Sequence, residues 1–123
     1  MNLHLYPSSF KNESRIEKIS QSISKCNIFS SIILIGTNEH GTPSSRKISE
    51  NVEVKLFGIT NRHYKIFGKI LVFIIWYFSV LRYLRSKSVK CVNAHSLSCL
   101  PLGIIIKLIS GCKLVYDTHE LET

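Results

Sequence analysis

The sequence predicts a single α/β domain, with a five-stranded parallel sheet and helices on both faces of that sheet. Short apolar runs of strand length alternate along the chain with longer segments whose apolar residues recur at helical spacing. The strand-like runs are mostly apolar, which is typical of strands buried on both faces of a parallel sheet. The 123 residues, 45% of them apolar, are enough for one domain with its own core, spanning 1–123.

The first half of the chain supplies three of the five expected strands, at 3–6, 31–36 and 52–59. The first strand ends at Pro7-Ser8-Ser9, which is a turn signal. Apolar positions three and four residues apart, with charges between them, predict an amphipathic helix over 13–26. The polar segment 38–49 contains glycine and proline, and we expect it to be a loop.

The second half supplies two helices and two strands. A long and very apolar helix is expected over 64–86, and a second helix over 101–110, with proline in its first turn and Gly111 at its end. The remaining strands are expected at 90–94 and 113–117. Right-handed crossovers favour an arrangement in which the five strands, numbered along the chain, lie in the order 3-2-1-4-5.

The formal net charge of +8 is concentrated in one segment. Residues 55–90 contain eight basic and no acidic residues, whereas the other eight basic residues are balanced by eight acidic ones. A basic excess confined to one segment implies an anionic partner, such as phosphate or anionic lipid. Nucleic acid is not expected as a partner, because the basic residues interleave with an apolar run and do not form a polar stripe.

The long helix has two interpretations that the sequence leaves open. On a helix, one face carries four residues that suit a membrane surface: Lys65, Lys69, Trp76 and Tyr83. The alternative is a helix packed on the sheet whose outer edge is basic. The apolar run 70–81 has twelve residues, whereas a bilayer-spanning helix needs about 20.

Cysteine usage and the N-terminus predict the compartment. The first 20 residues lack the continuous apolar segment of a secretory signal. None of the four cysteines forms a Cys-x-x-Cys pair or has metal-finger spacing, and Cys91, Cys99 and Cys112 lie among apolar neighbours. We therefore expect a cytoplasmic chain, peripheral on the inner face of the membrane if its long helix is interfacial, with no metal and no cofactor.

Candidate functional residues follow the strands. Ligands of parallel sheets bind outside the carboxyl ends of the strands, which here are followed by segments 7–10, 95–98 and 117–120. His95 suits hydrogen bonding to a phosphate or sugar hydroxyl and proton exchange near neutral pH, or else it is a structural histidine bonded to a loop carbonyl. Arg15 suits a phosphate, or else it is a solvated surface arginine.

The segment after the last expected strand carries three further polar residues, Asp117, His119 and Glu120. They suit proton-transfer chemistry if the chain places an acid and a base on one loop. The alternative is an acidic helix start, where carboxylates offset the helix dipole. Asp117 is interpreted as an orienting residue, and His119 is expected on the same edge of the sheet as His95.

The chain resembles the acceptor domain of family-4 glycosyltransferases in two segments: Val92-Asn93-Ala94-His95-Ser96-Leu97-Ser98-Cys99-Leu100-Pro101-Leu102-Gly103 and Gly111-Cys112-Lys113-Leu114-Val115-Tyr116-Asp117-Thr118-His119-Glu120-Leu121. The family pattern is roughly His-Ala-His-Asp, a Leu-Pro helix, and then Gly-(Ala/Cys)-Lys-Leu-Val-Tyr-Asp-x-His-Glu. Glu13-Ser14-Arg15-Ile16 is similar to the Asp-x-Arg-Val stretch after the family's first strand. The likeness covers essentially the whole chain, and its specific part is the C-terminal thirty residues.

The resemblance implies half of a GT-B fold, in which two Rossmann-like domains face each other across a cleft. The N-terminal domain receives the acceptor and the C-terminal domain holds the nucleotide-sugar donor, so we expect this chain to stop before the donor half and to be inactive alone. By resemblance, His95 is the active-site histidine. The expected substrate-binding residues are Ser8, Ser9, Arg15, Ser96, His119 and Glu120.

Two departures from the family pattern bear on substrate identity more than on fold. Asn93 stands where many relatives have a first histidine, and Ser96 where they have an acid. The turn at 7–9 lacks the glycine pair that often approaches the donor phosphates. The resemblance implies sugar transfer, retaining the anomeric configuration, to a lipid-linked or polysaccharide acceptor. The alternative is a non-catalytic, membrane-anchoring and acceptor-binding subunit of a two-chain glycosyltransferase.

Overall fold

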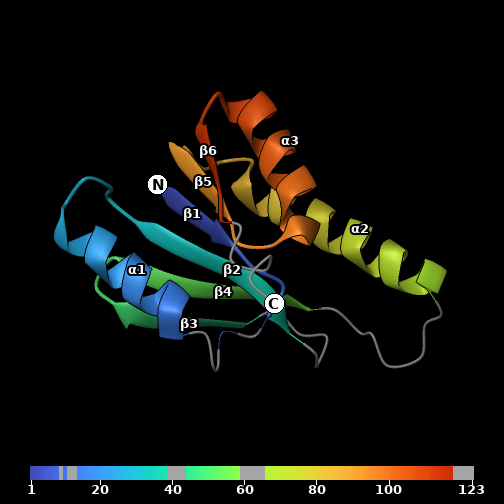
Figure 1. The fold of residues 1–123 in the computed structure, drawn as a ribbon, viewed down its shortest axis with the longest axis horizontal. Coiled ribbons are helices and arrows are strands. Elements are labelled where there is room, and N and C mark those ends of the chain that lie inside the picture. The colour runs from blue at the N-terminus through green and yellow to red at the C-terminus, as the bar shows by residue number, and fades with distance from the viewer. Residues whose placement is uncertain (9, 11–13, 39–43, 59–65, 118–123) are drawn as a thin grey trace.

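The computed structural model describes residues 1–8, 10, 14–38, 44–58 and 66–117. They form one sheet with α1 on one face and α2 and α3 on the other (Figure 1). In chain order the elements are β1 (Asn2–Leu5), α1 (Ser14–Lys25), β2 (Ile32–Asn38), β3 (Ser44–Ser49), β4 (Val52–Gly58), α2 (Ile66–Leu84), β5 (Cys91–Ala94), the 3₁₀ turn η1 (Leu97–Cys99), α3 (Leu100–Ser110) and β6 (Lys113–Tyr116).

The strand order in the sheet is β3-β4-β2-β1-β5-β6. The five strands expected from the sequence are β1, β2, β4, β5 and β6, and they pair in parallel in the expected order. The α/β class and this mostly parallel arrangement are therefore confirmed. The arrangement is compatible with a Rossmann-like domain.

The prediction of five strands and a purely parallel sheet is wrong at one edge. Residues expected to be a loop form a sixth strand, β3, which pairs antiparallel with β4. The sequence of this strand is polar because the strand lies at the edge of the sheet, where four of its six side chains are exposed. Arg46 holds it in place, since its guanidinium donates to the carbonyl of Phe10 at 3.0 Å and pairs with Glu17 of α1 at 2.9 Å.

Alternation along the strands divides the core between the two faces of the sheet. In β2, Ile33 and Ile35 pack with α2 and α3, whereas Ile32 and Leu34 pack on the side of α1. The α3 boundary is confirmed as predicted, because Gly111 has a left-handed φ of 71° and its N–H donates to the carbonyl of Lys107 at 2.8 Å.

The long apolar helix α2 packs on the sheet through Trp76. This side chain is fully buried, and its indole Nε1 donates to the carbonyl of Gly36 in β2 at 3.0 Å. The prediction that Trp76 contacts a membrane is therefore wrong: its face of the helix is core. The sequence left this open because α2 is apolar nearly all the way round, so periodicity does not mark the side that faces the sheet.

Of the other three residues expected to contact a membrane (Lys65, Lys69 and Tyr83), the structure describes the side chain of Tyr83 alone. Tyr83 is half-buried, with the ammonium groups of Lys55 and Lys87 each 5.5 Å from its ring centroid. Lys65 lies outside the described residues, and so does the side chain of Lys69. Within the described part of the chain, no helix combines the length and the apolar character needed to cross a bilayer.

Candidate functional site

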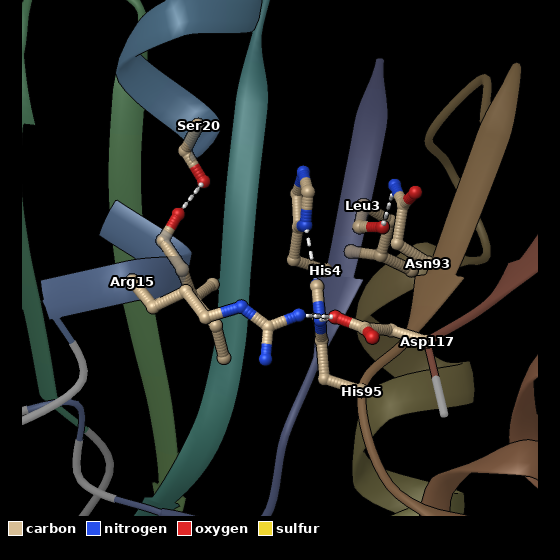
Figure 2. A network of polar contacts seen from close by, with 8 residues as sticks. Leu3, His4, Arg15, Ser20, Asn93, His95 and Asp117 are labelled. Atoms are coloured by element: carbon tan, nitrogen blue, oxygen red, sulfur yellow. Dashed lines mark hydrogen bonds and ion pairs between the residues drawn. The ribbon is translucent and has the colours of Figure 1, made fainter. Parts of the chain in front are cut away.

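The neighbouring parallel strands β1, β5 and β6 end at the same edge of the sheet and position the candidate site. The chain continues the ladder beyond β5 and β6, since the N–H of His95 donates to Leu5 at 3.0 Å and that of Asp117 to Ala94 at 2.9 Å. Arg15 reaches the same place from the first turn of α1 (Figure 2). Three predicted residues from distant segments therefore meet at the carboxyl edge of the sheet.

The carboxylate of Asp117 is the centre of this group. Its Oδ2 pairs with Nη2 of Arg15 and lies 3.3 Å from Nδ1 of His95. The Arg15 side chain is 50% exposed and that of Asp117 24%, whereas that of His95 is only 4% exposed. Asp117, interpreted from the sequence as an orienting residue, is thus the carboxylate that a ligand can reach, and His95 lies behind it.

Behind His95 lies a second histidine that the sequence reasoning missed. Nδ1 of His4 is 2.8 Å from Nε2 of His95, and the two rings are stacked with centroids 5.1 Å apart. His4 alternates with Leu3 and Leu5, whose side chains pack toward α2 and α3, so His4 points to the opposite face. An available signal was the histidine itself, because a polar ring inside a doubly buried strand needs a buried partner.

The donor and the acceptor of each hydrogen bond between Asn93, Asn2 and His4 can be assigned. Asn93 Nδ2 lies 3.1 Å from the carbonyl oxygen of Leu3, which can only accept, so Asn93 donates there and to Oδ1 of Asn2 at 2.6 Å. Asn2 then turns its Nδ2 toward Nε2 of His4, 3.4 Å away, and that ring nitrogen accepts.

The tautomers of both histidines follow from this direction. With Nε2 accepting, neutral His4 carries its proton on Nδ1 and donates to Nε2 of His95. His95 in turn carries its proton on Nδ1 and donates to Asp117. Each donor in this series of hydrogen bonds points toward the carboxylate of Asp117. We call the series the Asn2–Asp117 chain, and its members are Asn93, Asn2, His4, His95 and Asp117.

Burial keeps His4 neutral. Its pKa is lowered from 6.5 to about 3, first by desolvation of the ring, which is 1% exposed, and second by the neighbouring His95. A neutral His4 keeps one donating and one accepting nitrogen, as the chain of hydrogen bonds requires.

Two of the three predicted serines, Ser8 and Ser96, form hydrogen bonds within the fold. Ser8 shapes the turn after β1: its Oγ accepts from the N–H of Phe10 at 3.1 Å, and its carbonyl accepts from Thr37 at 2.9 Å. Ser96 is 3% exposed, with its Oγ 2.7 Å from that of Ser98. Ser9, His119 and Glu120 lie outside the described residues, and with them the expected proximity of His119 to His95.

The chemistry of this edge follows from which atoms are engaged. Both ring nitrogens of His95 have partners, so a ligand meets Asp117 and Arg15 first. A carboxylate accepts hydrogen bonds from hydroxyl groups, and a guanidinium pairs with phosphate. The pair suits a ligand that carries hydroxyls next to an anionic group.

The sequence matches no protein-family model and no curated protein. In the described ranges, no three His, Cys, Asp or Glu side chains are grouped so as to hold a metal ion.

Proposed function

We propose that this chain is the acceptor-side domain of a glycosyltransferase with GT-B architecture. Together with a donor-binding domain, it would transfer a sugar from a nucleotide-sugar to a lipid-linked or polysaccharide acceptor. The observation that carries the proposal is the convergence of Arg15, His95 and Asp117 at the carboxyl edge of the parallel sheet, where ligands of such sheets bind.

The roles proposed for Asp117, Arg15 and His95 follow from how exposed each side chain is. Asp117 accepts a hydrogen bond from an acceptor hydroxyl and holds it in one orientation. Arg15 pairs with Asp117 and offers its remaining N–H groups to an acceptor phosphate. His95, held by His4, keeps the carboxylate in place. For His95 to exchange a proton with substrate, as the sequence resemblance implies, one of its nitrogens has to leave its present partner.

Stabilisation of the charge on the leaving diphosphate is assigned to the donor-binding domain. Stabilisation of charge that develops in the transition state is usually the largest catalytic contribution, and it requires preorganised donors around the diphosphate. In this proposal the present chain supplies acceptor binding and orientation.

A titration followed by ¹H–¹⁵N NMR tests the acceptor site. The probe is a water-soluble, short-chain prenyl diphosphate-linked sugar. We expect the amides of Ser96 and Asp117 to shift, and Asp117→Asn to weaken binding roughly tenfold or more, since hydrogen bonds to a charged group contribute about 1.5–3 kcal/mol. Glu50→Gln, at an exposed position of the β3–β4 turn, is the matched control. Equal affinity of the Asp117→Asn variant and the wild type would contradict the proposal.

A second candidate is a non-catalytic subunit that binds acceptor and anchors a two-chain glycosyltransferase at the membrane. The exposed apolar side chains of α2 favour it. Co-purification with a separately encoded donor-binding chain would support this candidate, whereas a donor domain continuous with Thr123 in the same polypeptide would support the first.

A further inference from the structure

The outer face of α2 carries a stripe of apolar side chains that no described element covers. Its five members are between 44% and 68% exposed: Ile70, Leu71, Ile74, Ile75 and Phe78. Successive positions are one or three residues apart, which places them on one side of the helix, away from the buried Trp76. We call these five residues the α2 stripe. Contiguous apolar surface of this kind marks interaction sites in soluble proteins.

The stripe continues into a groove shared with α3. Phe78 and Ile109, which is 74% exposed, both line this groove of about 590 Å³. Its floor is apolar and includes Leu81 and Val89. The groove therefore joins the exposed apolar surface of the two helices into one face.

Cationic groups surround the groove at the end of the α2 stripe. Arg82, Arg85 and Lys87 line it, and all three are exposed. Neither arginine forms an ion pair with any residue that the structure describes. The sequence contains no acidic residue from 54 to 116, so α2, α3 and the segment that joins them supply no compensating negative charge.

We propose that the α2 stripe and the groove next to it dock on the surface of an anionic lipid bilayer, with α2 lying along the interface. Two observations favour lipid as the occupant. The stripe consists of aliphatic and phenyl groups without hydrogen-bonding atoms, which a hydrocarbon layer accommodates. The cations lie beside it, where lipid phosphates would meet them. The inference does not depend on the proposed glycosyltransferase activity.

This face differs from the one expected from the sequence. Trp76 lies on the opposite, core side of α2 and holds the helix to the sheet. Membrane contact is therefore assigned to the α2 stripe together with Arg82 and Arg85. Trp76 remains buried when the chain is bound.

Vesicle co-sedimentation of the purified chain tests the proposal. We expect binding to phosphatidylcholine vesicles that contain 30% phosphatidylglycerol, little binding to phosphatidylcholine alone, and weaker binding as salt is raised. Arg82→Glu with Arg85→Glu should reduce binding by roughly an order of magnitude or more. The matched control is Lys18→Glu with Lys25→Glu, which makes the same charge change at exposed positions of α1, on the other side of the sheet.

The apolar contribution needs its own pair of variants. Ile75→Ser with Phe78→Ser should reduce binding to the anionic vesicles by a similar factor, whereas Ile28→Ser, at a position 70% exposed outside α2 and α3, should leave it unchanged. Unaltered Trp76 fluorescence would show that the variants fold. Equal losses in the α1 control and the arginine variant would overturn the proposal. So would absence of binding by the wild type, or a dimer in sedimentation that Ile75→Ser with Phe78→Ser abolishes, because a second copy would then occupy the face.

Discussion

Nδ1 of His4 and Nε2 of His95 lie 2.8 Å apart, and this contact joins the first strand of the chain to a residue 91 positions later. The two rings are stacked, 12° from parallel, and both are almost fully buried. Through His95 the contact extends to the carboxylate of Asp117 at the edge of the sheet. A solvent-accessible acid is thus tied to a neutral histidine in the core.

Stability should depend on pH through His4. Its pKa is about 3 in the folded chain and 6.5 in the unfolded chain, so the unfolded state binds the proton more tightly between these values. The contribution is fully present above pH 6.5 and is lost as pH falls, with a slope of about 1 kcal/mol per pH unit near pH 5. Urea unfolding at pH 5, 6 and 7 measures this slope.

His4→Gln is the variant that isolates this effect. Glutamine keeps a donor and an acceptor at the position but has no charge to gain. We expect the variant to be less stable than the wild type at pH 7 and to show a shallower pH dependence between pH 5 and 7. An unchanged slope would mean that other groups cause it.

The tautomers of the two histidines can be observed directly. The Asn2–Asp117 chain requires the proton on Nδ1 in both His4 and His95 at neutral pH. Long-range ¹H–¹⁵N correlation spectra distinguish the two ring nitrogens. A proton on Nε2 of His95 would contradict the derived direction of the hydrogen bonds.

Gly36→Ala should destabilise the fold by about 1–3 kcal/mol or more. A Cβ at this position would lie 2.1 Å from the carbonyl oxygen of Ser8, and this backbone has little room to move. Gly103→Ala is the matched control, because its closest neighbour would be a side-chain methyl group of Leu114, at 2.9 Å, with the Cβ of Ala94 next at 3.7 Å, and alanine favours the helix. Equal unfolding free energies for the two variants would show that the turn at Ser8 adjusts freely.

Trp76→Phe should lower the free energy of unfolding by about 1–3 kcal/mol, because the carbonyl of Gly36 loses its buried donor. Phe78→Leu on the same helix should change it by less than about 0.5 kcal/mol, since Phe78 is 68% exposed. Thermal or urea denaturation compares the two. Similar small effects for both would indicate that Trp76 is not the anchor of α2.

Strands that are buried on both faces could be predicted from the sequence, whereas the exposed strand at the edge of the sheet could not. Strands such as β2 are recognisable because both faces are apolar, and their order follows from right-handed crossovers. The edge strand β3 was missed because its exposed side chains resemble those of a loop.

The candidate site was only partly predictable. His95 and Arg15 could be placed at the carboxyl edge from strand topology. Which of them is buried depends on contacts between residues far apart in the chain, such as His4 with His95, and periodicity carries no information on those. The side of α2 that faces the sheet could not be predicted for the same reason, because only packing on the sheet shows that Trp76 faces inward.

The most direct test of the proposed function is sugar transfer by the purified chain, alone and together with a GT-B donor-binding domain. Radiolabelled nucleotide-sugars and lipid-linked acceptors are the substrates, and incorporation of label into lipid is measured. We expect no transfer by the chain alone, because the donor diphosphate would lack preorganised groups to stabilise its charge. We expect transfer when the donor domain is joined or added, and its loss in Asp117→Asn. Turnover by the chain alone would contradict the assignment of this chain as an acceptor-side half.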